Sequence, residues 1–368
     1  MTDKNKTDLT AIRFVARLIL SLQDGITAPE LPEGIGWRDV YRVSRQHSVC
    51  SAVYEAAEEY IRATGDEALI LRFDTARSID FAKHAVQSME YERILSAFSS
   101  AGISHLAMKG FTFKALWTRP ECRSMADLDF YTGEYTERAG ELLVSLGYKT
   151  EGEDGHVHDS YEKPPYVKVE LHKRLYRDST ESFDSWVFDP SAPCRYEMKP
   201  ADFYLFALRH MYKHHKDGGF GIRTLFDMYL YEKRYEAELV EGRIEDRLAA
   251  AGLLDFYKSI RELMGLWFDG LDPECASEEL LSFESYVLFG GTYGNEDNRA
   301  RRGVEDSGRT KYMLSRLFPS YADMCLRYKW LARIPILLPV AYIMRFFSAL
   351  FGGRLRREMK SVGKANKE

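Results

Sequence analysis

The residues best suited to chemistry are three carboxylates in two short apolar segments. Asp127 and Asp129 belong to the segment Asp-Leu-Asp-Phe-Tyr, and Glu170 belongs to Val-Glu-Leu-His some forty residues later. Side chains alternate between the two faces of a strand, so Asp127 and Asp129 project from the same face. If the apolar residues of the second segment point into the core, Glu170 and His172 share its other face. Pairing of the two strands would then place Glu170 beside the aspartates.

Three carboxylates on one sheet surface repel one another unless a cation lies among them, and hard oxygen ligands select Mg²⁺ or Mn²⁺. Such a triad is typical of metal-assisted phosphoryl transfer. One metal, bridged by Asp127 and Asp129, would hold the phosphates of a nucleotide. A second metal, shared with Glu170, would lower the pKa of an acceptor hydroxyl and align it for in-line attack.

A lysine and a glycine stand between an apolar run and a helical pattern upstream of the aspartates. Gly110 would let the backbone approach a phosphate, which the N–H groups at the start of the helix would bind. Lys109 or Arg123 would supply the compensating positive charge. His172 would orient Glu170 or touch the substrate, with a structural strand histidine as the alternative. The predicted nucleotide-binding residues are therefore Lys109, Gly110, Arg123 and His172.

A change of periodicity after Gly102 predicts the elements that position these residues. Short apolar runs bounded by turn residues indicate strands, and apolar residues at helical spacing indicate helices. The expected helices cover 111–117 and 134–146, and the expected strands cover 103–108, 128–131, 148–150, 156–161 and 166–172. The fold class that follows is α+β, with a small mixed sheet and flanking helices in a core over residues 102–199.

Helical patterns lie on both sides of this core. They predict a helical amino-terminal region, a helical carboxy-terminal region and a basic, frayed tail, over residues 1–101, 200–352 and 353–368. A long helix over 67–99 is expected to turn its apolar residues inward, Ile79 and Met89 among them. In the carboxy-terminal region, Arg223 and Asp227 stand four residues apart on one helix, which favours an ion pair between them.

The composition restricts the class of protein. The chain has 45% hydrophobic and 29% charged residues, a balance typical of a globular protein. Its formal net charge of -5 gives no reason to expect DNA among its partners. The five cysteines form no CxxC pair, which argues against a disulfide framework or a thiolate zinc site. Because the polar start of the chain lacks the apolar core of a signal peptide, we expect a cytoplasmic protein.

The longest apolar stretch covers residues 334–351, where Pro335, Pro339 and Arg345 interrupt it. Its longest charge-free piece is shorter than the roughly 20 residues needed to span a bilayer. Basic residues flank the stretch on both sides. Two interpretations stay open. Residues 334–357 would contact a membrane surface, at the inner face of the inner membrane, or a partner protein. Alternatively, they form a packed terminal helix.

The ordered set of motifs resembles the nucleotidyltransferase superfamily, whose fold is like that of DNA polymerase beta. Within it, Lys109-Gly110 resembles an uncharacterised bacterial branch that carries Lys-Gly where other branches carry Gly-Ser. The resemblance covers nearly the whole chain. It includes the helix at 37–57 with His47, the Glu-Leu-His segment, and the helices at 210–214 and 223–227.

The resemblance implies an enzyme that transfers a nucleoside monophosphate from an NTP, such as ATP, to an acceptor hydroxyl and releases pyrophosphate. By that similarity Asp127 and Asp129 would bind the metal and Glu170 would be the third carboxylate. Lys109 and Gly110 would form the phosphate-binding turn. The acceptor stays open between a protein, an RNA and a small molecule. The alternative is a catalytically silent member of the fold that binds a nucleotide or a protein partner.

Overall fold

The computed structural model describes residues 3–153, 157–176, 186–300, 308, 311 and 318–351, so the tail predicted over 353–368 lies outside the described residues. The chain forms two compact units. One is Met1–Tyr212 with Gly221–Leu288, and the other is Lys213–Phe220 with Phe289–Glu368. The sheet and the candidate site belong to the first unit. The core boundaries predicted at 102–199 stay a prediction.

A mixed sheet of seven strands forms the centre of the first unit, with the order β3-β4-β5-β2-β1-β7-β6. β2 pairs in parallel with β5 and β1 with β7, while the other neighbours are antiparallel. The α+β prediction is confirmed. The two short strands β6 and β7 were not predicted. The strands are β1 (His105–Ala107), β2 (Leu128–Tyr131), β3 (Lys149–Glu153), β4 (His158–Lys163), β5 (Val167–His172), β6 (Val187–Phe188) and β7 (Arg195–Glu197).

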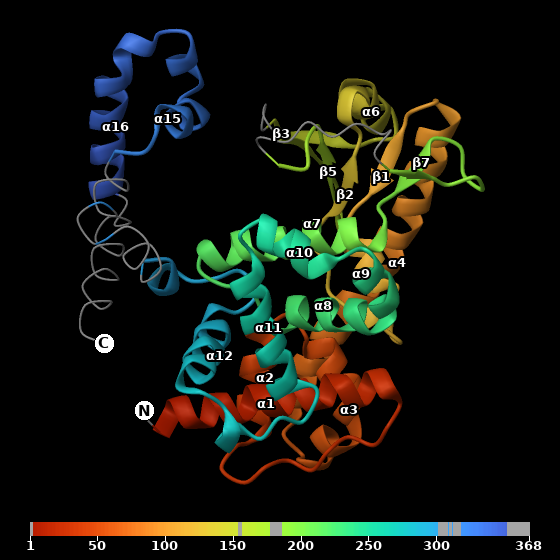
Figure 1. Ribbon diagram of the computed structural model, residues 1–368, viewed down its shortest axis with the longest axis vertical. Helices are drawn as coiled ribbons and strands as arrows, with labels where there is room; N and C mark the ends of the chain where they lie inside the picture. The colour runs from red at the N-terminus through yellow and green to blue at the C-terminus, as the bar shows by residue number, and fades with distance from the viewer. Residues whose placement is uncertain are drawn as a thin grey trace. The chain divides into compact units, whose positions relative to one another are not determined.

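One face of the sheet is apolar and packs against two helices. Leu128 and Phe130 of β2 are buried there together with Val169 and Leu171 of β5. The helices α4 (Glu67–Ser100) and α6 (Thr136–Ser145) contact this face, and Figure 1 shows α6 beside the strands. The alternation predicted for β2 and β5 is confirmed, because these apolar residues share one cluster. The residues between them therefore face the other side of the sheet.

The long helix α4 differs in one respect from its prediction. Ile79 and Met89 are exposed, at 42% and 62%, although both were expected to point inward. Polar residues are buried instead. Gln87 donates hydrogen bonds to the carbonyl oxygens of Met125 and Tyr166. Glu90 accepts hydrogen bonds from Tyr148, just before β3, and from Lys163 of β4. The prediction was wrong because α4 packs on α3 (Cys50–Ala63) with its first half and on the sheet with its second half, so no single apolar stripe runs along it.

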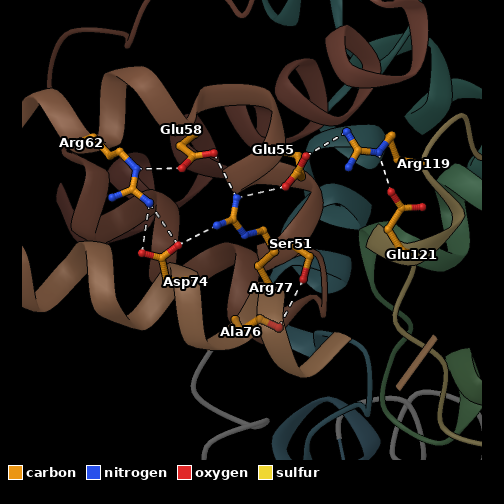
Figure 2. A network of polar contacts seen from close by, with 9 residues as sticks. All are labelled: Ser51, Glu55, Glu58, Arg62, Asp74, Ala76, Arg77, Arg119 and Glu121. Carbon is orange, nitrogen blue, oxygen red and sulfur yellow. Dashed lines mark hydrogen bonds and ion pairs between the residues drawn. The ribbon is translucent and has the colours of Figure 1, made fainter. Parts of the chain in front are cut away.

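The amino-terminal helices pack against the first half of α4. They are α1 (Asp3–Asp24), α2 (Trp37–Gln46) and α3 (Cys50–Ala63). Figure 2 shows the ion-pair network between α3 and α4, in which Arg77 bridges Glu55, Glu58 and Asp74. Glu55 also binds Arg119 at 2.9 Å, just before the short helix η1 (Pro120–Cys122). The network therefore fixes the loop that leads into β2.

Among the remaining helices of the first unit, α11 (Leu254–Trp267) and α12 (Glu278–Gly290) are joined to α1 through the carboxylate of Glu284. A bidentate ion pair joins Arg13 of α1 to Glu284 of α12, and Trp267 of α11 donates to the same carboxylate. The helices are α5 (Gly110–Lys114), α7 (Pro200–Lys216), α8 (Ile222–Arg234), α9 (Glu236–Glu241), α10 (Ile244–Ala250), α11 (Leu254–Trp267) and α12 (Glu278–Gly290), with η2 (Gly133–Tyr135) and η4 (Pro273–Cys275) between elements.

The buried side chain of His47 connects three helices of the first unit. Its Nδ1 accepts a hydrogen bond from the backbone N–H of Ile222 at 3.1 Å, so its Nε2 is the nitrogen that donates to the carbonyl of Leu288 at 3.0 Å. Burial lowers the pKa of His47 to about 4. The neutral imidazole thus ties the end of α2 to the start of α8 and to α12.

The described part of the second unit ends in a small helical hairpin. The helix α15 (Tyr321–Arg327) is followed by η5 (Lys329–Ala332), η6 (Pro335–Leu337) and α16 (Leu338–Phe351). Met324, Leu331 and Ala341 form its buried core. Among the residues that the structure describes, no helix is both long and apolar enough to cross a membrane.

Candidate active site

Three carboxylates converge where β2 and β5 run side by side. The parallel register places Asp129 opposite Glu170, and Asp127 stands just before β2. One carboxylate oxygen of each residue lies within 4.8 Å of the others. The convergence predicted from the strand pattern is confirmed. A site of this size, with three carboxylate oxygens, matches the ligands that Mg²⁺ and Mn²⁺ prefer.

The charges of this triad are unevenly stabilised. Burial, together with the nearby Asp129 and Glu170, raises the pKa of Asp127 to about 7. Burial also opposes ionisation of Asp129, yet Lys109 and His172 hold the pKa of Asp129 well below its usual range. Burial raises the pKa of Glu170, but the neighbouring imidazole groups of His172 and His158 together lower it by more, so the net direction is down. A divalent cation would relieve the repulsion that keeps Asp127 partly protonated near neutral pH.

Lys109 supplies positive charge directly to the triad. Its Nζ lies 3.5 Å from Oδ2 of Asp129, and its side chain is 16% exposed. The backbone of Lys109 has φ 26°, in the left-handed region that L-residues rarely adopt. This conformation connects the end of β1 to α5 and turns the chain toward Asp129. Lys109 thus lies beside the carboxylates, as the strand order predicts.

Gly110 is required by close packing. A Cβ atom at this position would lie 2.4 Å from Sδ of Met125 and 3.5 Å from the carbonyl oxygen of Asp127. The glycine therefore lets the turn after β1 lie against the segment that carries the aspartates. The helix expected over 111–117 is shorter than predicted, because α5 ends at Lys114 and a turn follows.

Arg123 lies in a different environment from the one expected. Its Nε and Nη2 bind the two carboxylate oxygens of Asp227 at 2.8 and 2.7 Å, and Trp117 donates to the same carboxylate at 2.8 Å. Arg123 and Asp227 are both buried. The structure therefore gives Arg123 a partner within the protein and does not place it with the three carboxylates. Its role in nucleotide binding stays a prediction.

This pair also corrects the expected partner of Asp227. The sequence pattern favoured Arg223, four residues earlier on α8, but Arg123 neutralises Asp227 from 104 residues away. Arg223 instead donates a hydrogen bond to the carbonyl of Ser124 at 2.6 Å. Its positive charge contributes to the field at Asp127. Sequence spacing alone does not connect Arg223 with the site.

Two histidines stand next to the carboxylates. Nε2 of His172 lies 3.1 Å from Oδ1 of Asp129 and 3.7 Å from Oε2 of Glu170. Burial lowers the pKa of His172, but the hydrogen bond to Asp129 and the negative charges of Asp129 and Glu170 together raise it by more. Its Nδ1 is buried and has no hydrogen-bond partner among the described residues. His172 therefore lies with the site, as predicted.

His158 is a neighbour of the site that the sequence pattern did not identify. It pairs with His172 across β4 and β5, and its Nε2 lies 3.7 Å from Oε2 of Glu170. The ligand atoms of His158, Glu170 and His172 lie within 4.8 Å of one another. The antiparallel register of β4 and β5 was the missing signal, because it puts alternate residues of both strands on the polar face.

Comparison with known families identifies the family to which the chain belongs. A family model described as an uncharacterised nucleotidyltransferase matches residues 33–269, more than half of the sequence. The chain belongs to this nucleotidyltransferase family. No curated protein and no solved structure matches it at a significant level. The matched region contains the complete sheet and all residues of the site, whereas α15 and α16 lie beyond it.

Proposed function

We propose that this member of the family is a metal-dependent nucleotidyltransferase that moves a nucleoside monophosphate from an NTP to an acceptor hydroxyl. The observation that carries the proposal is the convergence of Asp127, Asp129 and Glu170 beside Lys109. The acceptor oxygen forms a bond to the α-phosphorus, the bond from that phosphorus to the β-phosphate oxygen breaks, and pyrophosphate leaves. Protein, RNA and small molecules are candidate acceptors, and DNA is not expected.

Asp127, Asp129 and Glu170 would hold Mg²⁺ or Mn²⁺, and the donor set fits either ion. When bound, such a cation neutralises phosphate charge and lowers the pKa of a nearby hydroxyl. The imidazole groups of His158 and His172 add nitrogen donors at the edge of the triad. Nitrogen donors suit Mn²⁺ better than Mg²⁺. We therefore expect turnover with both ions and tighter binding of Mn²⁺.

Side chains of this protein would bind the phosphates, accept the proton and orient the accepting carboxylate. Lys109 would contact the phosphates and balance their charge, since its ammonium group already faces Asp129. Glu170 would accept the hydroxyl proton on a carboxylate oxygen. His158 and His172, each 3.7 Å from Oε2 of Glu170, would keep that carboxylate oriented. We place this chemistry in the cytoplasm, where NTPs are available.

A pyrophosphate-release assay with each NTP, together with calorimetry of NTP binding, tests this proposal. Asp129→Asn is expected to abolish Mg²⁺-dependent release while the circular dichroism spectrum stays unchanged. Asp159→Asn is the matched control, because Asp159 is a buried carboxylate of the same sheet that pairs with Lys173 and lies outside the triad. Equal release by Asp129→Asn and the parent would contradict the proposal. Tight NTP binding without any release by the parent would favour the silent binding protein.

A further inference from the structure

The hairpin of α15 and α16 carries an exposed apolar surface. Ile336, Val340, Ile343 and Met344 are exposed, with fractions of 84% for Ile336 and 56% for Ile343. Their spacing of four, three and one residues puts them on one side of the helical segment. The opposite side packs inward, where Ala341 and Leu338 contact the buried core of the hairpin. The segment is thus apolar on both sides, and only one side has a partner among the described residues.

The net charge of the carboxy-terminal part of the chain, which carries this surface, is opposite in sign to that of the rest. Residues 327–368 contain ten Lys and Arg against two Glu, a net charge of +8, whereas the whole chain carries -5. Residues 1–326 therefore carry -13. Arg327, Arg333 and Arg345 border the apolar residues in the described part of the hairpin. An exposed apolar helix face with basic neighbours is complementary to a membrane whose surface is anionic.

We propose that Ile336, Val340, Ile343 and Met344 insert into the interface of an anionic bilayer while the flanking arginines bind lipid phosphates. The helix lies in the plane of the membrane and does not cross it. α16 has 14 residues, a length of about 21 Å, which is shorter than the hydrocarbon core of about 30 Å. The positive charge favours an anionic bilayer over a second copy of the chain as the binding partner, because two surfaces that are both strongly basic repel each other.

Co-sedimentation of the full chain with vesicles tests this proposal. We expect the chain to bind vesicles of phosphatidylcholine with phosphatidylglycerol and to bind pure phosphatidylcholine at least tenfold more weakly. Binding should weaken further as the salt concentration rises from about 0.1 M to about 0.5 M, because screening removes the electrostatic part. Equal binding to both vesicle types, or binding to neither, would overturn the proposal.

A pair of variants identifies the surface. Ile336→Glu combined with Ile343→Glu should lower binding to anionic vesicles at least tenfold. Val240→Glu should leave it unchanged, because Val240 is an apolar residue of α9 with a similar exposure of 73%. Unchanged binding by the double variant would refute the assignment. Light scattering of the same proteins tests whether a second copy of the chain binds this surface instead. A dimer of the parent that becomes a monomer in the double variant, without vesicle binding, would assign the surface to a second copy.

Discussion

Acidification is expected to destabilise the protein through His47. The side chain is neutral and fully buried, with one nitrogen accepting and the other donating a hydrogen bond. Its pKa is about 4 in the folded protein and about 6.5 in an unfolded chain. Because the folded pKa lies below the unfolded one, the unfolded chain binds the proton more readily. Stability is therefore complete above pH 6.5 and is lost as the pH falls toward 4.

These two pKa values give the size of the effect. The contribution of His47 to the free energy of unfolding falls by about 2 kcal/mol between pH 7 and pH 5, and by about 3 kcal/mol at pH 4. Other groups also titrate in this range, so the comparison is made with His47→Gln, which cannot take up this proton. Urea unfolding of both proteins at pH 7 and pH 5 measures the difference.

The parent should lose about 2 kcal/mol more than His47→Gln over this interval. The variant is expected to be less stable at pH 7, because glutamine does not reproduce both hydrogen bonds of the imidazole. The two stabilities should then approach each other as the pH falls. An identical pH dependence of parent and variant would refute the assignment of His47 as a buried neutral group.

Three further predictions concern the site and its support. Because the pKa of Asp127 is raised to about 7, its proton must leave before a metal binds, so Mn²⁺ affinity should fall about tenfold per pH unit below 7 in calorimetry; a constant affinity from pH 8 to pH 6 would contradict this. Gly110→Ala should cost about 1–3 kcal/mol in thermal unfolding because Met125 must move, and this cost should be smaller when it is measured in a Met125→Ala background; an equal cost in both backgrounds would refute the contact. Asp227→Asn leaves the buried Arg123 uncompensated and should cost about 3 kcal/mol in urea unfolding, whereas an unchanged midpoint would refute the pair.

The centre of the site could be predicted from the sequence because it depends on local rules. Alternation along β2 puts Asp127 and Asp129 on one face, and the apolar residues of β5 put Glu170 on the matching face. Only one assumption linked them, namely that these two strands are neighbours. Placing Lys109 and Gly110 beside the aspartates needed an assumption of the same kind, namely that the short strand β1 is a neighbour of β2. Periodicity and strand order were enough for this part of the molecule.

The partners of Arg123 and Asp227 could not be predicted in the same way. They are 104 residues apart, and sequence spacing favoured the nearer Arg223. A pair four residues apart on a helix is worth only a few tenths of a kcal/mol, so tertiary packing easily replaces it. His158 was missed for a related reason, since its place depends on the register between β4 and β5. Contacts set by tertiary pairing leave no periodic signal.

The helix α4 shows the limit of helical periodicity. Its apolar residues follow the expected spacing, yet Met89 is exposed and Gln87 is fully buried. The helix has different neighbours along its length, so the buried direction rotates from one half to the other. Gln87 is buried because two backbone carbonyls accept its hydrogen bonds. The sequence does not contain that information in a local pattern.

The most direct test of the central claim follows the two ends of the nucleotide separately. The protein is incubated with cell extract, Mg²⁺ or Mn²⁺, and an NTP labelled at either its α- or its γ-phosphate. A nucleotidyltransferase transfers the α-label to an acceptor and releases the γ-label as pyrophosphate, and Asp129→Asn should do neither. Transfer of the γ-label to the acceptor, or equal labelling by Asp129→Asn and the parent, would contradict the account.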